Sequence, residues 1–307
     1  MQASLSAERR TQRSLGRIFA RGGPYLWVLP ALALFAVFRL YPMAFGLYLS
    51  LHDWDGNKPM VFVGLNNYVE VITQDLQFRT ALLHNAIYAV GTVIGKNVIA
   101  IFLAVLLNSQ IRGRTFFRVI LFMPVVMSFV VIALLWSWIY NYQFGLVNTG
   151  LEVIGLSVLK QDWLGDPKLA LYSLIAVDIW KWYGFHMVIY LAGLQSISPE
   201  LYEAAMIDGA GAWARFRRVT LPLLQPVTVV NVALSLMGAF NVFDLVYVMT
   251  DGGPAGATNV VLIHTYVQAF KFYKMGYGTA MSYVLLIIVM IISGLQIRIM
   301  SRNRVDY

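Results

Sequence analysis

Six apolar windows, each long enough to cross a bilayer, set the strongest limit on how this chain can fold. A helix needs about 20 mostly apolar residues to span the hydrocarbon core. Hydrophobic residues make up 59% of the 307 residues and charged residues only 12%, whereas a soluble domain has about 25% charged residues. The sequence therefore predicts an all-α membrane protein with six transmembrane helices, near Leu26–Leu51, Ala81–Leu107, Phe116–Tyr140, Leu169–Leu194, Pro222–Met249 and Gly278–Met300.

These windows leave too little chain for a soluble domain of ordinary size. We expect a basic tail at residues 1–23 and a single transmembrane domain at residues 24–307. The first window is too long for a signal peptide, so we expect it to be retained. The chain contains no cysteine, which excludes thiol chemistry, disulfides and Cys-ligated metal sites.

Basic residues gather in alternate connections. One set of segments holds 14 of the 23 Lys and Arg residues: Arg9, Arg10, Arg13, Arg17, Arg21, Arg112, Arg114, Arg118, Arg215, Arg217, Arg218, Arg298, Arg302 and Arg304. The other set holds six: Lys58, Arg79, Lys160, Lys168, Lys271 and Lys274. The positive-inside rule then places both termini in the cytoplasm. Anionic lipid headgroups account for the basic tail, and no nucleic-acid partner is expected.

A short polar segment separates the fourth and fifth windows. Ser198 suits a helix cap, Pro199 suits the first helical position, and Gly209 suits the stop. These signals predict a compact helix from Pro199 to Asp208 on the cytoplasmic side. From physical chemistry alone, this helix is either an ordinary connection between two transmembrane helices or a helix that contacts another protein.

The same segment resembles the EAA loop of the membrane subunits of ABC importers. That pattern is matched by Glu203-Ala204-Ala205, by Gly209 and by Leu221-Pro222, and the sugar-importer variant by Asp208-Gly209-Ala210 and Thr220-Leu221-Pro222. The resemblance implies that one set of residues couples the chain to a separate ATPase: Glu203, Ala204, Ala205, Asp208, Gly209, Leu221 and Pro222.

Two further motifs resemble the first of the two homologous permease subunits in carbohydrate importers of the maltose and glycerol-3-phosphate type. Phe62 to Tyr68 reads Phe-x-Gly-Leu-x-Asn-Tyr, and an interfacial helix capped by Asn66 is expected to follow on the outer surface. Thr250 to Pro254 reads Thr-x-Gly-Gly-Pro, which predicts a tight turn. The resemblance covers nearly the whole chain and implies the MetI-like permease fold.

Several charges fall inside the apolar windows, where they need a partner or a cavity. Arg39 lies beside Tyr41-Pro42 and suits snorkelling or a broken helix. Lys96 follows Gly91 and Gly95, but the spacing is not that of a phosphate loop, so nucleotide binding by this chain is excluded. The histidines form no metal-ligand pair and no nucleophile elbow is present, so we expect neither a catalytic nor a metal site.

The fourth window carries Asp178, Lys181, Trp182 and Phe185 on one helix face. Two interpretations remain open: an intrahelical Asp178–Lys181 pair beside packing aromatics, or a sugar site that combines polar groups with flat rings. The resemblance implies the second, because the sugar-contacting positions of the maltose-type first subunit fall on these four residues.

In the fifth window the corresponding positions fall on Ala239 and Val242, whose side chains form no hydrogen bonds. Asn241 and Asp244 are candidates in their place, or they bond only to other helices. The basic residues Arg39, Lys96 and Lys181 outnumber the acidic Asp178 and Asp244 in the windows, which leans weakly toward an anionic sugar and leaves the solute open.

The resemblance implies a non-catalytic permease subunit in a bacterial or archaeal plasma membrane, working by alternating access. Its implied partners are a second homologous permease subunit, an ATPase dimer that binds ATP and Mg, and an extracytoplasmic solute-binding protein. No cofactor is expected in this chain. A secondary transporter would instead be expected to show inverted repeats or a carboxylate relay, and would carry no EAA loop.

Overall fold

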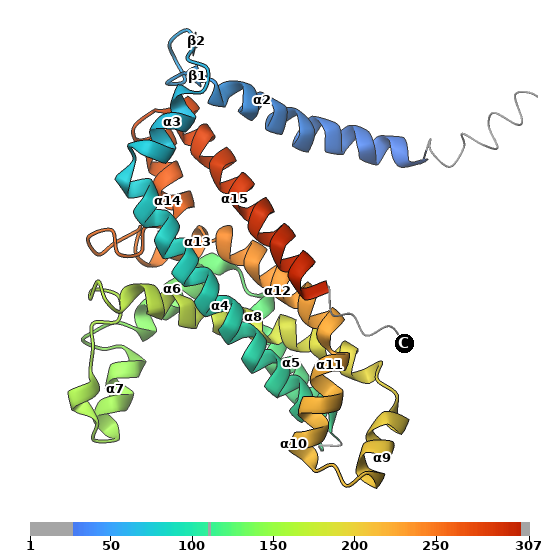
Figure 1. Cartoon of the computed structure of the whole chain (residues 1–307). Helices are drawn as coiled ribbons and strands as arrows, with labels where there is room; N and C mark the ends of the chain where they lie inside the picture. Colours follow the sequence, from blue (N-terminus) through green and yellow to red (C-terminus); the bar gives the residue numbers. More distant parts are fainter. Residues whose placement is uncertain (1–26, 110–111, 302–307) are drawn as a thin grey trace, which may run out of the picture.

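The computed structural model describes residues 27–109 and 112–301, which are almost entirely helical (Figure 1). The predicted tail at residues 1–23, with its five arginines, lies outside the described residues, as do Arg302 and Arg304. One small antiparallel hairpin pairs β1 (His52–Asp53) with β2 (Val61–Phe62), with His52 opposite Phe62. This hairpin defines one end of the molecule, here called the hairpin end.

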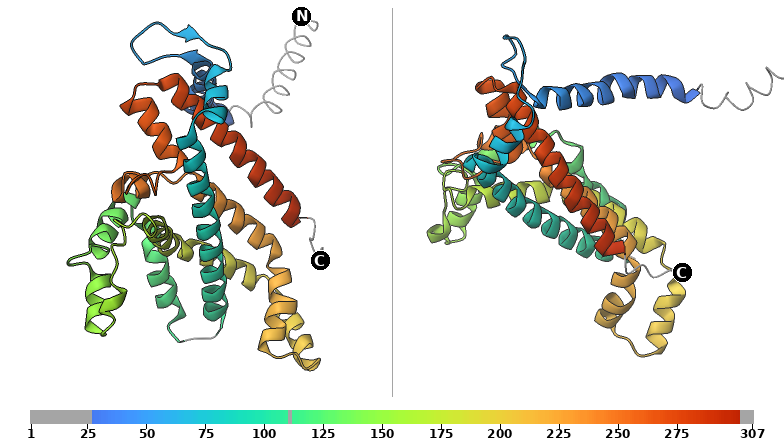
Figure 2. Two further views of the ribbon diagram at one scale, coloured as in Figure 1. Left: turned by 60° about the vertical axis from the view of Figure 1, so that its left-hand side comes forward. Right: turned by 45° about the horizontal axis from the view of Figure 1, so that its top comes forward.

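The first predicted span is one helix, Trp27–Ser50, with a π-helical stretch η1 (Ala36–Leu40) that leads into α2 (Tyr41–Ser50). None of its most apolar stretch is buried. The helix joins the body near the hairpin and extends away from the other helices (Figures 1 and 2). Because such a surface is stable only in lipid or against another protein, this helix adds little to the core of its own chain.

The core centres on α4 (Leu76–Asn108) and α8 (Ala170–Gln195), which lie side by side. Glycine at positions 91 and 95 allows this approach. A Cβ on Gly91 would lie 3.1 Å from the Ile175 side chain, and one on Gly95 would overlap Ile179. The helices α12 (Gln225–Phe240) and α15 (Met275–Ser301) complete the bundle.

The third predicted span is broken, so the expected continuous helix over Phe116–Tyr140 is wrong. The structure has α5 (Arg114–Val126) and α6 (Phe129–Ile139), bent by 99°. Pro124 weakens the last turn of α5 because it lacks an N–H, and the chain leaves the helix at Met127, whose backbone is extended (φ −72°, ψ 145°). The Ser128 hydroxyl then accepts a hydrogen bond from Val131 N at 3.3 Å and starts α6.

The fifth predicted span is also interrupted. A continuous helix over Pro222–Met249 is wrong because α12 ends at Phe240 and α13 (Asp244–Met249) starts after a short gap. Before α12, a run made of α10 (Ala212–Arg215), η3 (Phe216–Thr220) and α11 (Leu221–Leu223) meets it at 68°.

Among the described residues, three helices are long and apolar enough to cross a membrane, and the number rises to five if each of the two bent helix pairs counts as one span. The fourth predicted window corresponds to α8, which is 26 residues long. Its charged residues Asp178 and Lys181 are buried inside the protein. A helix whose polar face is covered by protein can still lie across a bilayer.

Shorter elements flank the long helices at two places. The elements α3 (Asn66–Thr73), α14 (Val261–Tyr266) and η4 (Val267–Lys271) lie toward the hairpin end, whereas α7 (Leu146–Val153) and η2 (Ser157–Leu159) follow α6 and lie away from the hairpin (Figure 1). The predicted helix after the hairpin is therefore present as α3, but the cap assignment is wrong: Leu65 is the N-cap and Asn66 is the first helical residue. The predicted turn is confirmed, since Asp251 and Gly252 have φ of 45° and 83°.

Asp75 holds three helices together at this end. Its carboxylate caps α4 by accepting from Phe78 N at 2.8 Å, and its other oxygen contacts His264 Nε2 and the Tyr277 hydroxyl at 2.9 Å each. Burial raises the pKa of Asp75, but the hydrogen bonds from His264, Phe78 and Tyr277 together outweigh burial and leave the pKa below its ordinary value of 3.8.

Candidate functional site

The predicted helix of the polar segment is confirmed as α9 (Pro199–Ile207). Ser198 caps it by accepting from Glu200 N at 3.3 Å. Its end has the two bonds of a Schellman motif, Ala210 N to Ala205 O at 2.8 Å and Gly209 N to Met206 O at 3.0 Å. Gly209 has φ +76°, a conformation that strongly favours glycine.

The helix α9 projects from the molecule with its polar and apolar side chains open to solvent. Glu203, Ala204, Asp208 and Gly209 are exposed, Ala205 is half-buried, and Ile207 is 87% exposed. A hydrogen bond of 3.1 Å between the Tyr202 and Thr220 hydroxyls ties α9 to η3. Leu221 and Pro222 are also exposed and start α11, directly after η3. The segment is thus anchored on one side and free on the other.

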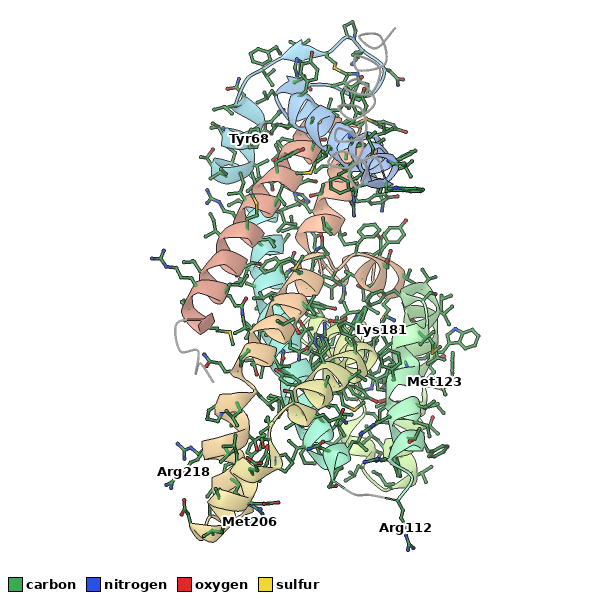
Figure 3. All side chains as sticks on the ribbon, turned by 90° about the vertical axis from the view of Figure 1, so that its right-hand side faces the viewer. Tyr68, Arg112, Met123, Lys181, Met206 and Arg218 are labelled. Atoms are coloured by element: carbon green, nitrogen blue, oxygen red, sulfur yellow. The ribbon has the colours of Figure 1, made fainter. Side chains whose placement is uncertain are left out.

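Two of the basic connections lie at the same end of the molecule as α9. Figure 3 places Met206 of α9, Arg112 and Arg218 at one end and Tyr68 at the other, with Lys181 between them. The connections that carry Arg112 and Arg218 therefore lie together with α9, and the hairpin and α3 lie at the opposite end (Figures 1 and 3).

A cavity of about 400 Å³ lies between α4, α6, α8, α12 and α13. Most of its wall is aromatic or apolar, with a few polar groups; the residues that line it are Lys96, Phe129, Asp178, Trp182, Phe185, His186, Leu234, Gly238, Asn241, Val242, Phe243, Asp244 and Leu245. The Trp182 ring lies 6.1 Å from the Phe129 ring and 5.6 Å from the Phe185 ring, centroid to centroid. Flat rings beside a few polar groups suit a ligand that has both apolar faces and hydroxyls.

A buried ion pair forms part of the cavity wall. Lys96 Nζ lies 2.6 Å from Asp178 Oδ2, and the two side chains are 2% and 4% exposed. This pair joins α4 to α8. Asp178 is therefore neutralised across helices by Lys96, and the intrahelical pair with Lys181 does not form.

Lys181 faces a different set of groups. Its ammonium donates to the backbone carbonyls of Pro124, Val125 and Met127 at 3.4, 3.3 and 2.6 Å. Although Lys181 shares a helix face with Asp178 and Trp182, it does not line the cavity.

A chain of buried polar side chains runs from the cavity along α8. His186 Nδ1 lies 2.8 Å from Asn231 Oδ1, and His186 Nε2 lies 3.2 Å from Ser235 Oγ. Asn97 donates through Nδ2 to Ser235 Oγ at 3.2 Å, and its Oδ1 accepts from the Tyr190 hydroxyl at 2.7 Å. These bonds satisfy most of the polar groups where α4, α8 and α12 meet, so the wall of the cavity is held rigidly.

Of the four fifth-window positions considered above, three line the cavity and one does not. Asn241 and Asp244 both line the cavity and are exposed, and Asn241 Nδ2 donates to Met237 O at 2.8 Å. Val242 also lines it, whereas Ala239 is fully buried away from it. The break between α12 and α13 is what turns residues 241 and 244 toward the same space.

Sequence reasoning missed Lys96, Phe129, His186 and Phe243 as cavity residues. For Lys96 a signal exists: glycines at positions 91 and 95 predict a close helix contact, and a lone cation beside that contact calls for an anion on the neighbouring helix. Phe129 and Phe243 offer no such signal, because they reach the cavity only through the breaks in the third and fifth spans.

Comparison with known proteins gives consistent findings. The sequence profile of the family "Binding-protein-dependent transport system inner membrane component" matches residues 96–304. Probable ABC transporter permease protein YurN of Bacillus subtilis is 39% identical over 284 residues, which cover 92% of this chain and 97% of YurN.

A second relative and one solved structure extend the comparison. Trehalose/maltose transport system permease protein MalF of Thermococcus litoralis is 36% identical over 273 residues, covering 88% of this chain and 90% of that protein. The structure of a bacterial alginate ABC transporter in complex with alginate pentasaccharide-bound periplasmic protein contains a chain with TM-score 0.79 and 25% identity, covering 91% of this chain and 94% of that one.

Proposed function

Since the chain belongs to the family of binding-protein-dependent transport system inner membrane components, we propose that it is one permease subunit of an ATP-driven importer of a sugar. The observation that carries the proposal is the cavity between α8 and α12, where the rings of Trp182 and Phe185 lie beside Asn241 and Asp244. The relative from Thermococcus litoralis, which is named for trehalose and maltose transport, supports a carbohydrate as the solute.

The solute is a neutral sugar. The excess of basic residues in the windows favoured an anionic one, but Lys96 is paired with Asp178 and Lys181 is bonded to three carbonyls. Neither cation is left to meet a solute anion, and Asp244 adds a negative charge to the cavity wall. Hydroxyl groups can bond to Asn241 and Asp244 while a sugar face packs on Trp182.

A second, homologous permease subunit completes the path. The helix Trp27–Ser50 supports this part of the proposal, since its apolar surface is unburied and it extends away from its own chain. A mostly apolar helix that buries little of its surface within its own chain is suited to the surface of a neighbouring subunit in the membrane.

A separate ATPase drives transport through α9. The exposed Glu203, Asp208 and Ile207 give this helix both charge and apolar area for a groove in the ATPase. The glycine stop at position 209 and the Tyr202–Thr220 bond keep the helix rigid against η3, so movement of the ATPase is transmitted to α12. ATP and Mg bind to the ATPase, and a solute-binding protein delivers the sugar at the hairpin end. Both termini lie in the cytoplasm, as the positive-inside rule indicates.

The test is uptake by the source strain with and without the gene for this chain. Labelled neutral disaccharides and monosaccharides are offered beside labelled uronates and sugar phosphates. Loss of uptake of a neutral sugar, restored by the parent gene but not by a Gly209→Arg variant, is expected. Unchanged uptake of every neutral sugar, with loss of an anionic solute alone, would overturn the assignment of solute class.

A further inference from the structure

The end of α5 is partly buried, with Pro124 buried, Val125 half-buried and Val126 77% exposed, and its last backbone carbonyls need hydrogen-bond donors. The last four carbonyls of a helix have no partner within it, and in a membrane no water is present to replace one. The 99° bend after Val126 separates these carbonyls from α6, which would otherwise satisfy them.

Lys181 supplies the donor. Its ammonium reaches the carbonyls of Pro124, Val125 and Met127, the closest at 2.6 Å, and the residue is 3% exposed. A cation also suits the negative end of a helix dipole. The same ammonium lies 4.8 Å from the centre of the Phe129 ring and 5.1 Å from the centre of the Trp182 ring, which are two walls of the cavity.

The helices hold this contact in register. Gly184 lies one turn after Lys181 on the same face of α8, and a Cβ at that position would overlap the Leu121 carbonyl. The backbones of α8 and α5 therefore touch there, and the Lys181 side chain extends from this fixed point to the end of α5. A longer residue at position 184 would move the ammonium away from the carbonyls.

We propose that Lys181 is a positioning residue: its ammonium keeps the third span bent and thereby sets Phe129 against Trp182 in the wall of the solute cavity. The role in solute binding rests on the proposed function. Lys181 acts neither as the partner of Asp178, which is bonded to Lys96, nor as a contact for the solute, since it does not line the cavity.

The bend is measured directly with spin labels in the assembled full chain, which has no native cysteine. Phe116 and Trp138 are exposed, and each is 11 residues from Met127. At 1.5 Å per residue, the two Cα atoms are about 21 Å apart with the 99° bend and about 33 Å apart in a straight helix. Labels are placed there as Phe116→Cys and Trp138→Cys, and pulsed electron resonance gives the distance.

Lys181→Met is expected to shift the distance distribution toward the longer value, and Lys181→Arg is expected to keep the parent distribution. The matched control is the double variant Lys96→Met with Asp178→Asn, which removes two buried charges beside the cavity but none of the donors to α5, and it is expected to keep the bend. A parent-like distribution in Lys181→Met, or an equal shift in Lys181→Met and Lys181→Arg, would overturn the proposal.

Transport supplies the second measurement. Lys181→Met is expected to weaken the apparent affinity for the transported sugar on the order of tenfold, with Lys181→Arg restoring it. If no sugar is transported by the parent, the proposed function fails while the label distances still test the bend. If the bend opens but apparent affinity is unchanged, the cavity does not depend on the bend and the positioning role is wrong.

Discussion

The Lys96–Asp178 pair gives the sharpest quantitative prediction, because two lysines, one on each of two helices, are candidate partners of the same carboxylate. Lys96 is 2.6 Å from Asp178 on another helix, whereas Lys181 is one turn away on the same helix. Both members of the pair are almost completely buried, so removing one partner leaves an uncompensated charge. Such a change costs about 3–5 kcal/mol of stability.

Two double-mutant cycles separate the partners. Lys96→Met and Asp178→Asn are each expected to lower stability by about 3–5 kcal/mol, and the double variant should cost less than either single change because no charge is left alone. For Asp178→Asn with Lys181→Met the two losses should be nearly additive, since Lys181 is bonded to the carbonyls at the end of α5.

The assay is thermal unfolding of the purified protein in a mild detergent, followed as the fraction that remains monodisperse after heating. Recovery of stability in the Lys96/Asp178 double variant, with none in the Asp178/Lys181 double variant, is the expected pattern. The reverse pattern would show that the intrahelical pair forms in the membrane and that the α4–α8 contact is wrong.

Three further outcomes follow from the structure. Gly209→Val should abolish sugar uptake while leaving the chain in the membrane, and Gly209→Asn should retain more uptake. The reason is that the backbone conformation at φ +76° costs an ordinary residue about 1–2 kcal/mol and costs asparagine less. Equal uptake by the two variants would contradict this prediction. Single cysteines at positions 160 and 215 should react with an impermeant thiol reagent on intact cells only at 160, and labelling only at 215 would reverse the orientation. Because the pKa of Asp75 is lowered in the folded protein, the stabilising effect of its carboxylate is present above pH 3.8 and is lost as the pH falls through the lower folded pKa. The loss of stability with falling pH should therefore be less steep in Asp75→Asn than in the parent. Identical acid-unfolding profiles would argue against this role of Asp75.

Much of the helical layout could be read from the sequence because single residues decide it. Window length located the helices, and Ser198, Pro199 and Gly209 fixed both ends of α9 through a cap, a preset φ and a positive φ. The turn at Asp251 followed from glycine and proline in the same way. These signals are local, so they need no knowledge of neighbouring helices.

The breaks were harder to predict because an apolar window shows length but not continuity. Pro124 was a local signal for the first break, and only together with the Ser128 cap does it give two helices. At the second break, Asn241 and Phe243 lie in a run as apolar as a continuous span. The cavity depends on both breaks, which is why Phe129 and Phe243 were missed.

The partners of the buried charges could not be predicted because they depend on how two helices are rotated about their axes. Asp178 has a lysine three residues away and another on α4, and only the packing of Gly91 and Gly95 on Ile175 and Ile179 brings Lys96 close. The first helix shows the same limit: apart from Arg39 it is almost uniformly apolar, so its sequence has no polar face that indicates what it packs against.

The central claim is that the cavity beside α8 binds the transported sugar, and one comparison on that helix tests it most directly. Trp182 lines the cavity, whereas Tyr172 is an aromatic residue of the same helix that is 59% exposed and lies outside it. Loss of one ring contact of about 1–3 kcal/mol, by analogy with base stacking on aromatic side chains, predicts that Trp182→Ala weakens the apparent affinity of uptake roughly ten- to a hundredfold. Tyr172→Ala should leave that affinity at the parent value. Equal apparent affinities in the parent and both variants would contradict the account.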